Sequence, residues 1–478
     1  MDFQQRSLKL HFIPYLAAGH FIPLCDLATL FVSRGQHVTV ITTPSNAQIL
    51  RKSNPSLHLH IVDFPSKEVG LDDGVQTMTN LDNLTNSAKF YRAAMLLRGP
   101  IELFVEQHRP DYIVADFLYP WVDDMANNLG IPRLAFNGFS LFTVSAMESV
   151  KAHSTTLHSE TGPFDIPDFP HHITMCSRPP KMFTKFMEPL LGLELKSYGL
   201  IVNNFEELDG EEYVHHYEKI TGHKAWHIGP ACMVRRMAQE KAVRGEKSVV
   251  SEQECLSWLN SKPASSVVYI CFGSVCRFPD KQLFEMACGM EQGGYNFIWV
   301  VPEKKGKEDE SEEEKEKWLP KGFEERNKDQ VMIIRGWAPQ LLILSHSSVG
   351  AFLTHCGWNS TLEGTSAGVP MITWPVQGDQ FYNERLITQV RGIGVQVGAT
   401  EWSIIGFGER QKLVDRDSIH NAITRLMDGA DEAVQIRRRA RRFGEKAKKA
   451  LQHGGSSHNN LTALIEDLMR FKDSKPLQ

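Results

Sequence analysis

The chain has 478 residues, of which 42% are hydrophobic and 23% charged, and its formal net charge is −5. This length is too great for one ordinary hydrophobic core, so we expect two domains of roughly 200 residues each. The composition is that of a soluble globular protein. No apolar run is as long as the about 18 residues that a membrane-spanning helix needs. The negative net charge gives no reason to expect a nucleic-acid partner.

The first half of the chain alternates between short apolar runs and segments with helical spacing. The runs are typical of buried parallel strands and occupy residues 8–13, 37–43, 57–63, 112–115, 131–136 and 198–203. One amphipathic helix is expected from about residue 85 to about residue 108. The alternation predicts an α/β domain with a doubly wound parallel sheet over residues 1–236.

Two polar residues follow strands of this predicted sheet. His20 comes after residues 8–13, and Asp116 comes directly after residues 112–115. Ligands of an open parallel sheet bind at the carboxyl ends of its strands. His20 suits a general base because imidazole titrates near neutral pH, and Asp116 would fix its tautomer and stabilise the imidazolium. We predict these two residues as the catalytic pair, against a helix-start histidine and a strand-end cap as structural alternatives.

A polar, aperiodic stretch at residues 237–251 predicts a linker between domains. A second α/β pattern occupies residues 252–455, with a strand at 267–272 and a Gly273-Ser274 turn before a helix. We therefore expect two domains that face each other across a cleft. The loops at residues 67–84 and 151–186 are expected to shape that cleft.

Two charged runs in the second half carry no predicted function. Residues 303–317 contain mixed charges and are expected to form a solvated insertion. Residues 437–449 are strongly basic and have helical spacing, which favours an exposed amphipathic helix over a site for anionic lipid or RNA.

Residues 354–360 form a junction between an apolar run, residues 349–353, and a segment with helical spacing, residues 358–367. At a strand-to-helix junction, unpaired N–H groups and the helix dipole favour an anion. A glycine in the turn lets a diphosphate approach the backbone closely. The residues that supply this turn and the side-chain donors are Gly357, His355, Asn359 and Ser360.

Four further residues complete a nucleotide-sugar site. Glu363 lies one helical turn beyond the junction, where its carboxylate would accept from two ribose hydroxyls. Trp337 follows another strand-like run and would stack on a base. Asp379 and Gln380 follow a strand and a glycine turn, and together they can accept from and donate to neighbouring sugar hydroxyls.

The stretch from Trp337 to Gln380 resembles the signature box of plant secondary-product glycosyltransferases, which transfer sugar from a UDP-sugar to a small lipophilic acceptor. The matching residues are Trp337, Gln340, His355, Gly357, Trp358, Asn359, Ser360, Glu363, Asp379 and Gln380. The resemblance covers the whole chain and implies a GT-B fold of two Rossmann-like domains. It also implies that a C-terminal helix, residues 456–478, packs back on the first domain. The expected UDP-sugar site consists of the matching residues with Ser274 and Ala338.

The resemblance and the residues together predict the reaction. One base and no second carboxylate as nucleophile predict direct displacement with inversion, without a metal and with no cofactor beside the co-substrate UDP-glucose. In the family, glutamine at the last box position accompanies glucose, and Trp358 in place of arginine leaves no cation for a glucuronate. Xylose is the main alternative donor. The acceptor expected from the resemblance is a hydroxyl or carboxyl of a triterpenoid or saponin, with flavonoids and other phenolics as the alternative.

The eight cysteines form no C-x-x-C pair and predict reduced thiols in a cytoplasmic protein, which we expect to be a monomer.

Three competing motifs are weaker. Gly364 to Gly368 satisfies the G-x-S-x-G pattern of serine hydrolases, but no strand directly precedes Ser366. Gly392, Gly394 and Gly398 are one residue too widely spaced for the dinucleotide fingerprint. Asp415-Arg416-Asp417 matches a metal-binding D-x-D pattern but opens a helical run. A UDP-sugar-binding protein without catalysis is a third functional class.

Overall fold

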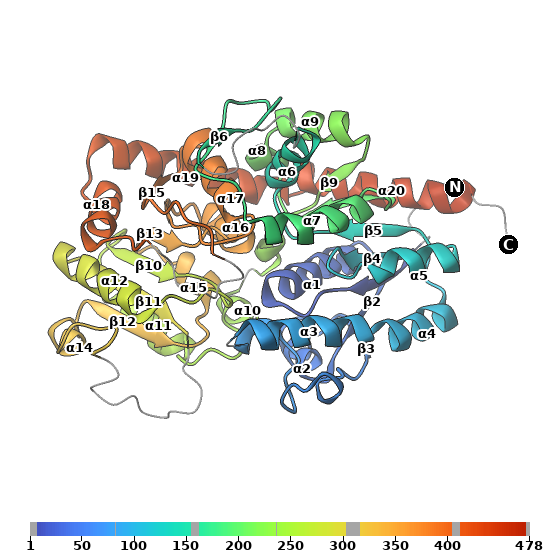
Figure 1. Ribbon diagram of the computed structural model, residues 1–478, viewed down its shortest axis with the longest axis horizontal. Helices are drawn as coiled ribbons and strands as arrows, with labels where there is room; N and C mark the ends of the chain where they lie inside the picture. Colours follow the sequence, from blue (N-terminus) through green and yellow to red (C-terminus); the bar gives the residue numbers. More distant parts are fainter. Residues whose placement is uncertain are drawn as a thin grey trace. The chain divides into compact units, whose positions relative to one another are not determined.

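The computed structural model describes residues 7–81, 83–153, 162–235, 237–302, 316–403 and 412–474. The chain divides into two compact units (Figure 1). Unit 1 consists of Met1–Ser154, Lys181–Arg235 and Ala447–Gln478, and unit 2 consists of Thr155–Pro180 and Arg236–Lys446. The predicted charged insertion lies, from residue 303 to residue 315, outside the described residues.

Among the described residues of unit 1, seven parallel strands form one sheet in the order β3-β2-β1-β4-β5-β8-β9. Most of these strands are apolar runs buried on both faces, as expected for a parallel sheet with helices on either side. The strands are β1 (Lys9–Ile13), β2 (His37–Thr42), β3 (His58–Ile61), β4 (Tyr112–Asp116), β5 (Arg133–Phe136), β8 (Gly199–Val202) and β9 (Ala225–His227).

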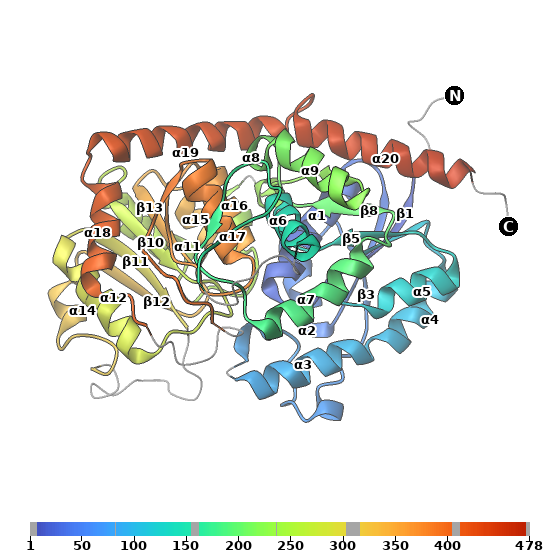
Figure 2. The same ribbon diagram turned by 45° about the horizontal axis from the view of Figure 1, so that its top comes forward.

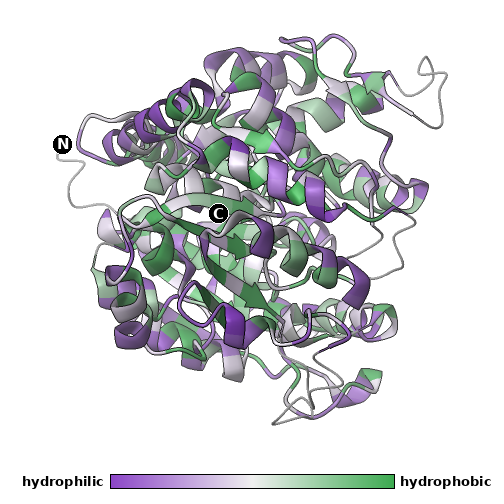
Figure 3. Ribbon diagram, turned by 90° about the vertical axis from the view of Figure 1, so that its left-hand side faces the viewer, coloured by the Kyte–Doolittle hydropathy of each residue, from purple (hydrophilic) through white to green (hydrophobic). Residues whose placement is uncertain are grey.

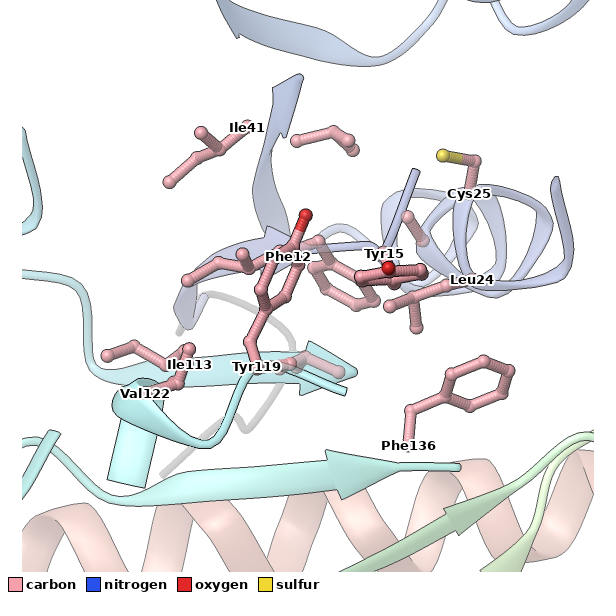
Figure 4. Close-up of a cluster of buried hydrophobic side chains, with 14 of the residues drawn as sticks. Phe12, Tyr15, Leu24, Cys25, Ile41, Ile113, Tyr119, Val122 and Phe136 are labelled. Carbon is pink, nitrogen blue, oxygen red and sulfur yellow. The ribbon is translucent and has the colours of Figure 1, made fainter. Parts of the chain in front are cut away.

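Helices surround this sheet, and their apolar faces complete its core. They are α1 (Ala18–Ser33), α2 (Pro44–Ser53), α3 (Leu84–Leu96), α4 (Arg98–His108), α5 (Trp121–Leu129), α6 (Leu141–Ala152), α7 (Lys181–Glu194), α8 (Glu206–Asp209), α9 (Glu211–Thr221) and α20 (Ser456–Ser474). Figure 4 shows part of the core, a cluster of buried side chains that includes Phe12 of β1, Leu24 of α1 and Ile113 of β4. Each of these side chains is fully shielded from solvent.

The C-terminal helix α20 belongs to unit 1. Its buried residues Leu461, Leu464 and Leu468 join the core of the first sheet, and the helix contacts β9. Figure 2 shows α20 beside the strands of this unit. The Tyr112 hydroxyl on β4 donates to the backbone oxygen of Leu468 at 2.6 Å. The last part of the chain therefore completes the core that the first residues begin.

Unit 2 has a second parallel sheet, in which the described residues form six strands in the order β12-β11-β10-β13-β14-β15. The hydrophobic residues of the structure concentrate on sheet strands, whereas the helices also carry hydrophilic residues (Figure 3). The six strands are β10 (Val267–Cys271), β11 (Asn296–Val301), β12 (Val331–Arg335), β13 (Val349–Thr354), β14 (Met371–Thr373) and β15 (Gly394–Gln396).

The helices of unit 2 are α10 (Ala238–Ala242), α11 (Glu252–Asn260), α12 (Asp280–Gly293), α14 (Phe323–Arg326), α15 (Gln340–Leu344), α16 (Trp358–Ala367), α17 (Gln380–Arg385), α18 (Arg416–Met427) and α19 (Asp431–Ala450), the last of which runs into unit 1. A small antiparallel hairpin, β6 (Phe164–Asp165) with β7 (Thr174–Met175), also belongs to this unit and contacts α17. In the part of the chain that the structure describes, no helix is long and apolar enough to cross a membrane.

One local expectation was wrong, and a second segment is more ordered than its sequence indicated. The single helix expected at residues 85–108 is two helices, because Pro100 lacks the N–H that a helix interior needs and fits only in the first turn of a new helix, α4. The stretch at residues 237–251, predicted as the linker between domains, begins where unit 1 passes into unit 2 and contains α10, which packs against α15 of unit 2. This segment is therefore part of the second unit's structure.

Candidate functional site

The strand order of unit 1 reverses direction between β1 and β4. Chain connections from these neighbouring strands leave on opposite sides, which opens a crevice at their carboxyl ends where ligands of α/β sheets bind. β1 pairs with β4 up to Ile13 and Ala115. His20 lies in the first turn of α1, which follows β1, and Asp116 is the last residue of β4. The fold thus brings the two predicted residues to one edge of one sheet.

His20 and Asp116 form a hydrogen-bonded pair. The His20 Nδ1 and Asp116 Oδ2 atoms are 2.8 Å apart. Asp116 is fully buried, and its other oxygen accepts from the backbone N–H of Leu118 at 3.0 Å. The His20 side chain keeps 20% of its surface exposed. An ionised carboxylate accepts only, so it places the ring proton on Nδ1 and leaves Nε2 to take a proton from a ligand.

Aromatic rings surround this histidine. The ring centroid of Phe117 lies 6.0 Å from that of His20 in a stacked orientation, and Tyr15 approaches at 6.1 Å edge-on. Phe139 packs edge-on against Phe117 at 5.6 Å. Apart from the Asp116 carboxylate, these neighbours of the imidazole are aromatic rings, which suit a lipophilic ligand better than a charged one.

Unit 2 has its own reversal of strand order, between β10 and β13. These strands pair up to Cys271 and Thr354, so the segments that follow them begin side by side. Gly273 and Ser274 follow β10, and residues 355–360 follow β13 and lead into α16. The predicted diphosphate junction thus lies at the same kind of crevice as the His20 pair, with the N-terminus of α16 beside it.

His355 fits between two glycines. A Cβ atom built on Gly273 would lie 2.7 Å from the His355 Cε1 atom, and one on Gly357 would lie closer still to the ring. Shielding from water lowers the pKa of His355 to about 4, so the ring is neutral at pH 7. Its Nδ1 atom is buried and has no hydrogen-bond partner among the described residues. The neutral ring can donate a hydrogen bond to a ligand, but it brings no positive charge to the site.

Glu363 of α16 is held by two side chains. Its Oε2 atom accepts from Gln340 Nε2 at 2.8 Å, and its Oε1 atom accepts from Arg244 Nη1 at 2.5 Å. Gln340 also donates to Ser360 Oγ at 3.1 Å and accepts from the Tyr269 hydroxyl at 3.3 Å. The predicted residues Gln340, Ser360 and Glu363 are therefore one connected network. Arg244 was missed because it lies 119 residues from Glu363 and no local pattern marks it.

Asp379 and Gln380 are adjacent and nearly buried at the start of α17. The Gln380 Oε1 atom accepts from the backbone N–H groups of Val376 and Gln377, at 2.8 and 2.9 Å. Asp379 Oδ2 accepts from Asn383 Nδ2 at 2.6 Å. Because the amide oxygen closes the preceding turn, Gln380 can offer only its amide N–H groups to a sugar hydroxyl.

The remaining predicted residues occupy the same edge of the second sheet. Trp337 and Ala338 follow β12, and Trp358 and Asn359 are the first two residues of α16. Trp337 is half-buried, and its Nε1 atom is buried without a hydrogen-bond partner among the described residues. A flat ring at a strand end, beside the Gln340 network, is suited to stack on a base.

The competing motifs do not form sites. Ser366 lies inside α16, so the strand that a nucleophile elbow requires is not there. Gly394 begins β15, so the glycine motif runs through a strand and does not join a strand to a helix. Asp415 caps α18, where its Oδ1 atom accepts from the Ser418 N–H at 2.7 Å. Over the described ranges, no three His, Cys, Asp or Glu side chains are grouped to hold a metal ion.

Comparison with known proteins finds a matching family model and relatives that are similar over nearly the whole chain. Residues 12–427 match the family model described as UDP-glucoronosyl and UDP-glucosyl transferase. UDP-glucosyl transferase 73CC6 of Saponaria officinalis is 47% identical, over 98% of each chain. UDP-glucose flavonoid 3-O-glucosyltransferase 7 of Fragaria ananassa is 43% identical, over 97% of this chain and 96% of the relative.

Two solved structures extend the comparison to three dimensions. UGT73P12 of Glycyrrhiza uralensis, in complex with glycyrrhetinic acid 3-O-monoglucuronide, superposes with a TM-score of 0.88 at 38% identity, covering 98% of this chain and 96% of that chain. UGT89C1 of Arabidopsis thaliana, in complex with UDP-L-rhamnose, superposes with a TM-score of 0.76 at 28% identity, covering 97% and 99%.

Proposed function

The chain belongs to the UDP-glucoronosyl and UDP-glucosyl transferase family, and from this premise we propose that it transfers glucose, with inversion, from UDP-glucose to a hydroxyl or carboxyl of a lipophilic plant small molecule. The predicted family, the enzyme class of UDP-glycosyltransferase and the GT-B fold of two Rossmann-like domains are confirmed. The observation that carries the proposed chemistry is the His20 and Asp116 pair at the strand-order reversal of unit 1.

The proposed reaction begins with His20. Its Nε2 atom removes the proton from the acceptor hydroxyl while the oxygen attacks the anomeric carbon, and Asp116 stabilises the imidazolium that forms. No covalent intermediate is needed, so the bond to UDP breaks as the new bond forms and the configuration inverts. The departing diphosphate is stabilised by the N-terminus of α16 and by donors from His355, Asn359, Ser360 and Ser274. These donors take the place of a metal ion.

The donor site is proposed in unit 2. Trp337 and Ala338 receive the base, Gln340 and Glu363 receive the ribose, and Trp358, Asp379 and Gln380 receive the sugar. Support comes from the relatives, of which one is described as a UDP-glucosyl transferase, one as a UDP-glucose flavonoid 3-O-glucosyltransferase, and one was solved with UDP-L-rhamnose bound. UDP-glucose is the proposed donor, with UDP-xylose as the alternative.

The acceptor is proposed to be a triterpenoid or saponin. The rings of Tyr15 and Phe117 beside His20 favour a large apolar molecule, and a relative with glycyrrhetinic acid 3-O-monoglucuronide bound superposes with a TM-score of 0.88. A flavonoid is the second candidate, favoured by the relative from Fragaria ananassa. We further propose that the enzyme works as a cytoplasmic monomer.

One experiment tests donor, acceptor and metal requirement together. The purified enzyme is incubated with UDP-glucose and a mixed panel of triterpenoid, flavonoid and simple phenolic aglycones, with and without EDTA, and the products are identified by mass spectrometry. We expect a hexosylated triterpenoid, the release of one UDP per product, and the same yield with EDTA. Absence of any glycoside would contradict transfer, and a complete loss restored by magnesium or manganese would contradict the proposed role of the α16 junction.

A further inference from the structure

We propose that Arg244 is a positioning residue for the donor nucleoside, an inference that rests on the proposed function. Its guanidinium, together with the Gln340 amide, holds the Glu363 carboxylate in one orientation, in which the remaining lone pairs accept from ribose hydroxyls. Arg244 lies in the segment between α10 and α11, outside the box that resembles the family signature.

The contacts of Glu363 divide evenly between its two oxygens. Arg244 Nη1 binds Oε1 at 2.5 Å, and Gln340 Nε2 binds Oε2 at 2.8 Å. A glutamate has three rotatable side-chain bonds, so one partner alone leaves the carboxylate free to turn. Two partners on different oxygens fix both its position and the plane of its carboxylate.

A carboxylate has about four lone-pair directions. Two of those on Glu363 are taken by the protein, which leaves one on each oxygen for a ligand. The 2′ and 3′ hydroxyls of a ribose are adjacent donors and match that number. The number of remaining lone pairs therefore favours a complex in which the ribose binds Glu363 while Arg244 stays in place.

The charge of Arg244 has a second effect. The Glu363 side chain is 4% exposed and that of Arg244 is 10% exposed, so the pair is largely desolvated. Glu363 lies one helical turn beyond Asn359 and Ser360, the predicted diphosphate donors. An uncompensated carboxylate there would repel a diphosphate, and the guanidinium offsets this repulsion.

The segment that carries Arg244 is attached to the nucleoside half of the site at further points. The Val249 N–H donates to the backbone oxygen of Trp337 at 3.2 Å. Lys241 Nζ donates to Ser345 Oγ at 2.9 Å, and α10 packs against α15, the helix that begins with Gln340. The segment is therefore anchored beside both the proposed base-stacking ring and the proposed ribose ligands.

The test compares two nucleotides that differ only in one ribose hydroxyl. Calorimetric titration gives the dissociation constants of UDP and 2′-deoxy-UDP for the wild type and for R244Q. We expect the wild type to prefer UDP by about 10-fold, the effect of one hydrogen bond to a charged group. R244Q is expected to weaken both nucleotides, because both carry the diphosphate that the uncompensated Glu363 repels, and to lose most of the preference for UDP, because the carboxylate is no longer held to accept from the 2′ hydroxyl. K247Q, which removes an exposed charge three residues away, is the matched control and should behave as the wild type does.

Other outcomes separate the possible failures. A preference for UDP that persists unchanged in R244Q, or tighter UDP binding by R244Q, would overturn the positioning role. A wild type that binds neither nucleotide would instead contradict the proposed function. If R244Q does not fold, R244K decides: it keeps the charge and one donor, so the preference should survive within about 3-fold. Its complete loss in a folded R244K would also overturn the proposal.

Discussion

The imidazole of His20 is a useful base in only one tautomer, and Asp116 selects that tautomer from 96 positions away along the chain. The Asp116 carboxylate is fully buried, so solvent does not compete with His20 for its hydrogen bond. The partly exposed ring can still meet a ligand. Burial of the orienting group and exposure of the reacting group are properties of single side chains, and they give His20 its proposed role.

His20→Ala should lower the transfer rate by roughly 100-fold or more, since general-base catalysis contributes at least that much. UDP binding should stay nearly unchanged, because the proposed nucleotide ligands all belong to unit 2. Steady-state rates and a calorimetric dissociation constant for UDP provide the two readings. His58→Ala, which removes an exposed histidine of β3, is the control. Activity of the His20 variant within a few-fold of the wild type would remove this residue from the mechanism.

The neutral state of His355 predicts a loss of stability in acid. Its folded pKa of about 4 lies below the unfolded value of 6.5, so the unfolded chain binds a proton that the folded chain excludes. The full stability is therefore present above pH 6.5 and falls as the pH drops towards 4, by about 3 kcal/mol for such a group. His11, in the core of unit 1, has a pKa lowered to about 4 by burial and acts in the same direction.

Denaturant unfolding between pH 7 and pH 4 measures this dependence. His355→Asn should flatten the part of the pH dependence that arises from unit 2, and the part from His11 should remain. Equal pH slopes in the variant and the wild type would show that His355 is not held neutral.

At the scale of elements, the decisive feature is a pair of neighbouring parallel strands at the point where the strand order reverses. The segments that follow these two strands begin side by side. In unit 2 the β10 and β13 ends bring Gly273 against His355, and α16 starts three residues later at Trp358. Neither segment alone forms an anion site. The proposed anion site needs the N–H groups at the start of α16 and the absence of a side chain on Gly273.

Gly273→Ala tests this close approach. Gly273 has a φ of +73°, and an added Cβ would lie 2.7 Å from the His355 ring, so the ring must move. We expect UDP binding to weaken by about 10-fold or more, together with a loss of roughly 1 kcal/mol of stability from backbone strain. Gly429→Ala is the matched control, because Gly429 has a φ of +78° with no atom within 4 Å of an added Cβ. It should lose stability and keep UDP affinity, and a similar loss of affinity in both variants would contradict the role of His355.

At the scale of the whole molecule, two parallel sheets of similar design carry different chemistry. Unit 1 presents a histidine and carboxylate pair beside aromatic rings, and unit 2 presents helix N–H groups, a carboxylate network and an amide. The proposed function assigns acceptor chemistry to unit 1 and donor recognition to unit 2. Selectivity for the sugar should therefore depend on residues of unit 2, chiefly Asp379 and Gln380.

Competition among UDP-glucose, UDP-galactose, UDP-xylose and UDP-glucuronate at equal concentration should give mainly the glucoside. The Gln380 N–H groups can meet a hydroxyl, and Trp358 offers no cation to a glucuronate. Xylose should be the strongest competitor, because one missing hydroxymethyl group changes selectivity by only roughly 1 to 3 kcal/mol. Product ratios from mass spectrometry give the answer. A clear preference for another sugar would show that these residues do not set the donor.

The amino-acid sequence by itself determined the alternation of strands and helices, the strand-to-helix junction at residues 354–360, and the positions of His20 and Asp116 after strands. Each of these depends on local patterns: a strand buried on both faces is a continuous apolar run, and a helix start leaves N–H groups unpaired. The donor-site residues could be proposed from the sequence, because most of them lie in the contiguous stretch from Trp337 to Gln380.

Only the tertiary structure decided which of these pieces meet. Local patterns show which face of a strand is buried but not which strand lies beside it, so the pairing of β1 with β4 that joins His20 to Asp116 required the folded sheet. For the same reason the sequence did not reveal the contact of Arg244 with Glu363, which is 119 residues away. It also did not reveal that the Gln380 side-chain oxygen accepts hydrogen bonds from the preceding turn. A polar residue in an aperiodic segment has no periodicity that reveals its contacts, and its role is set by the backbone that packs against it.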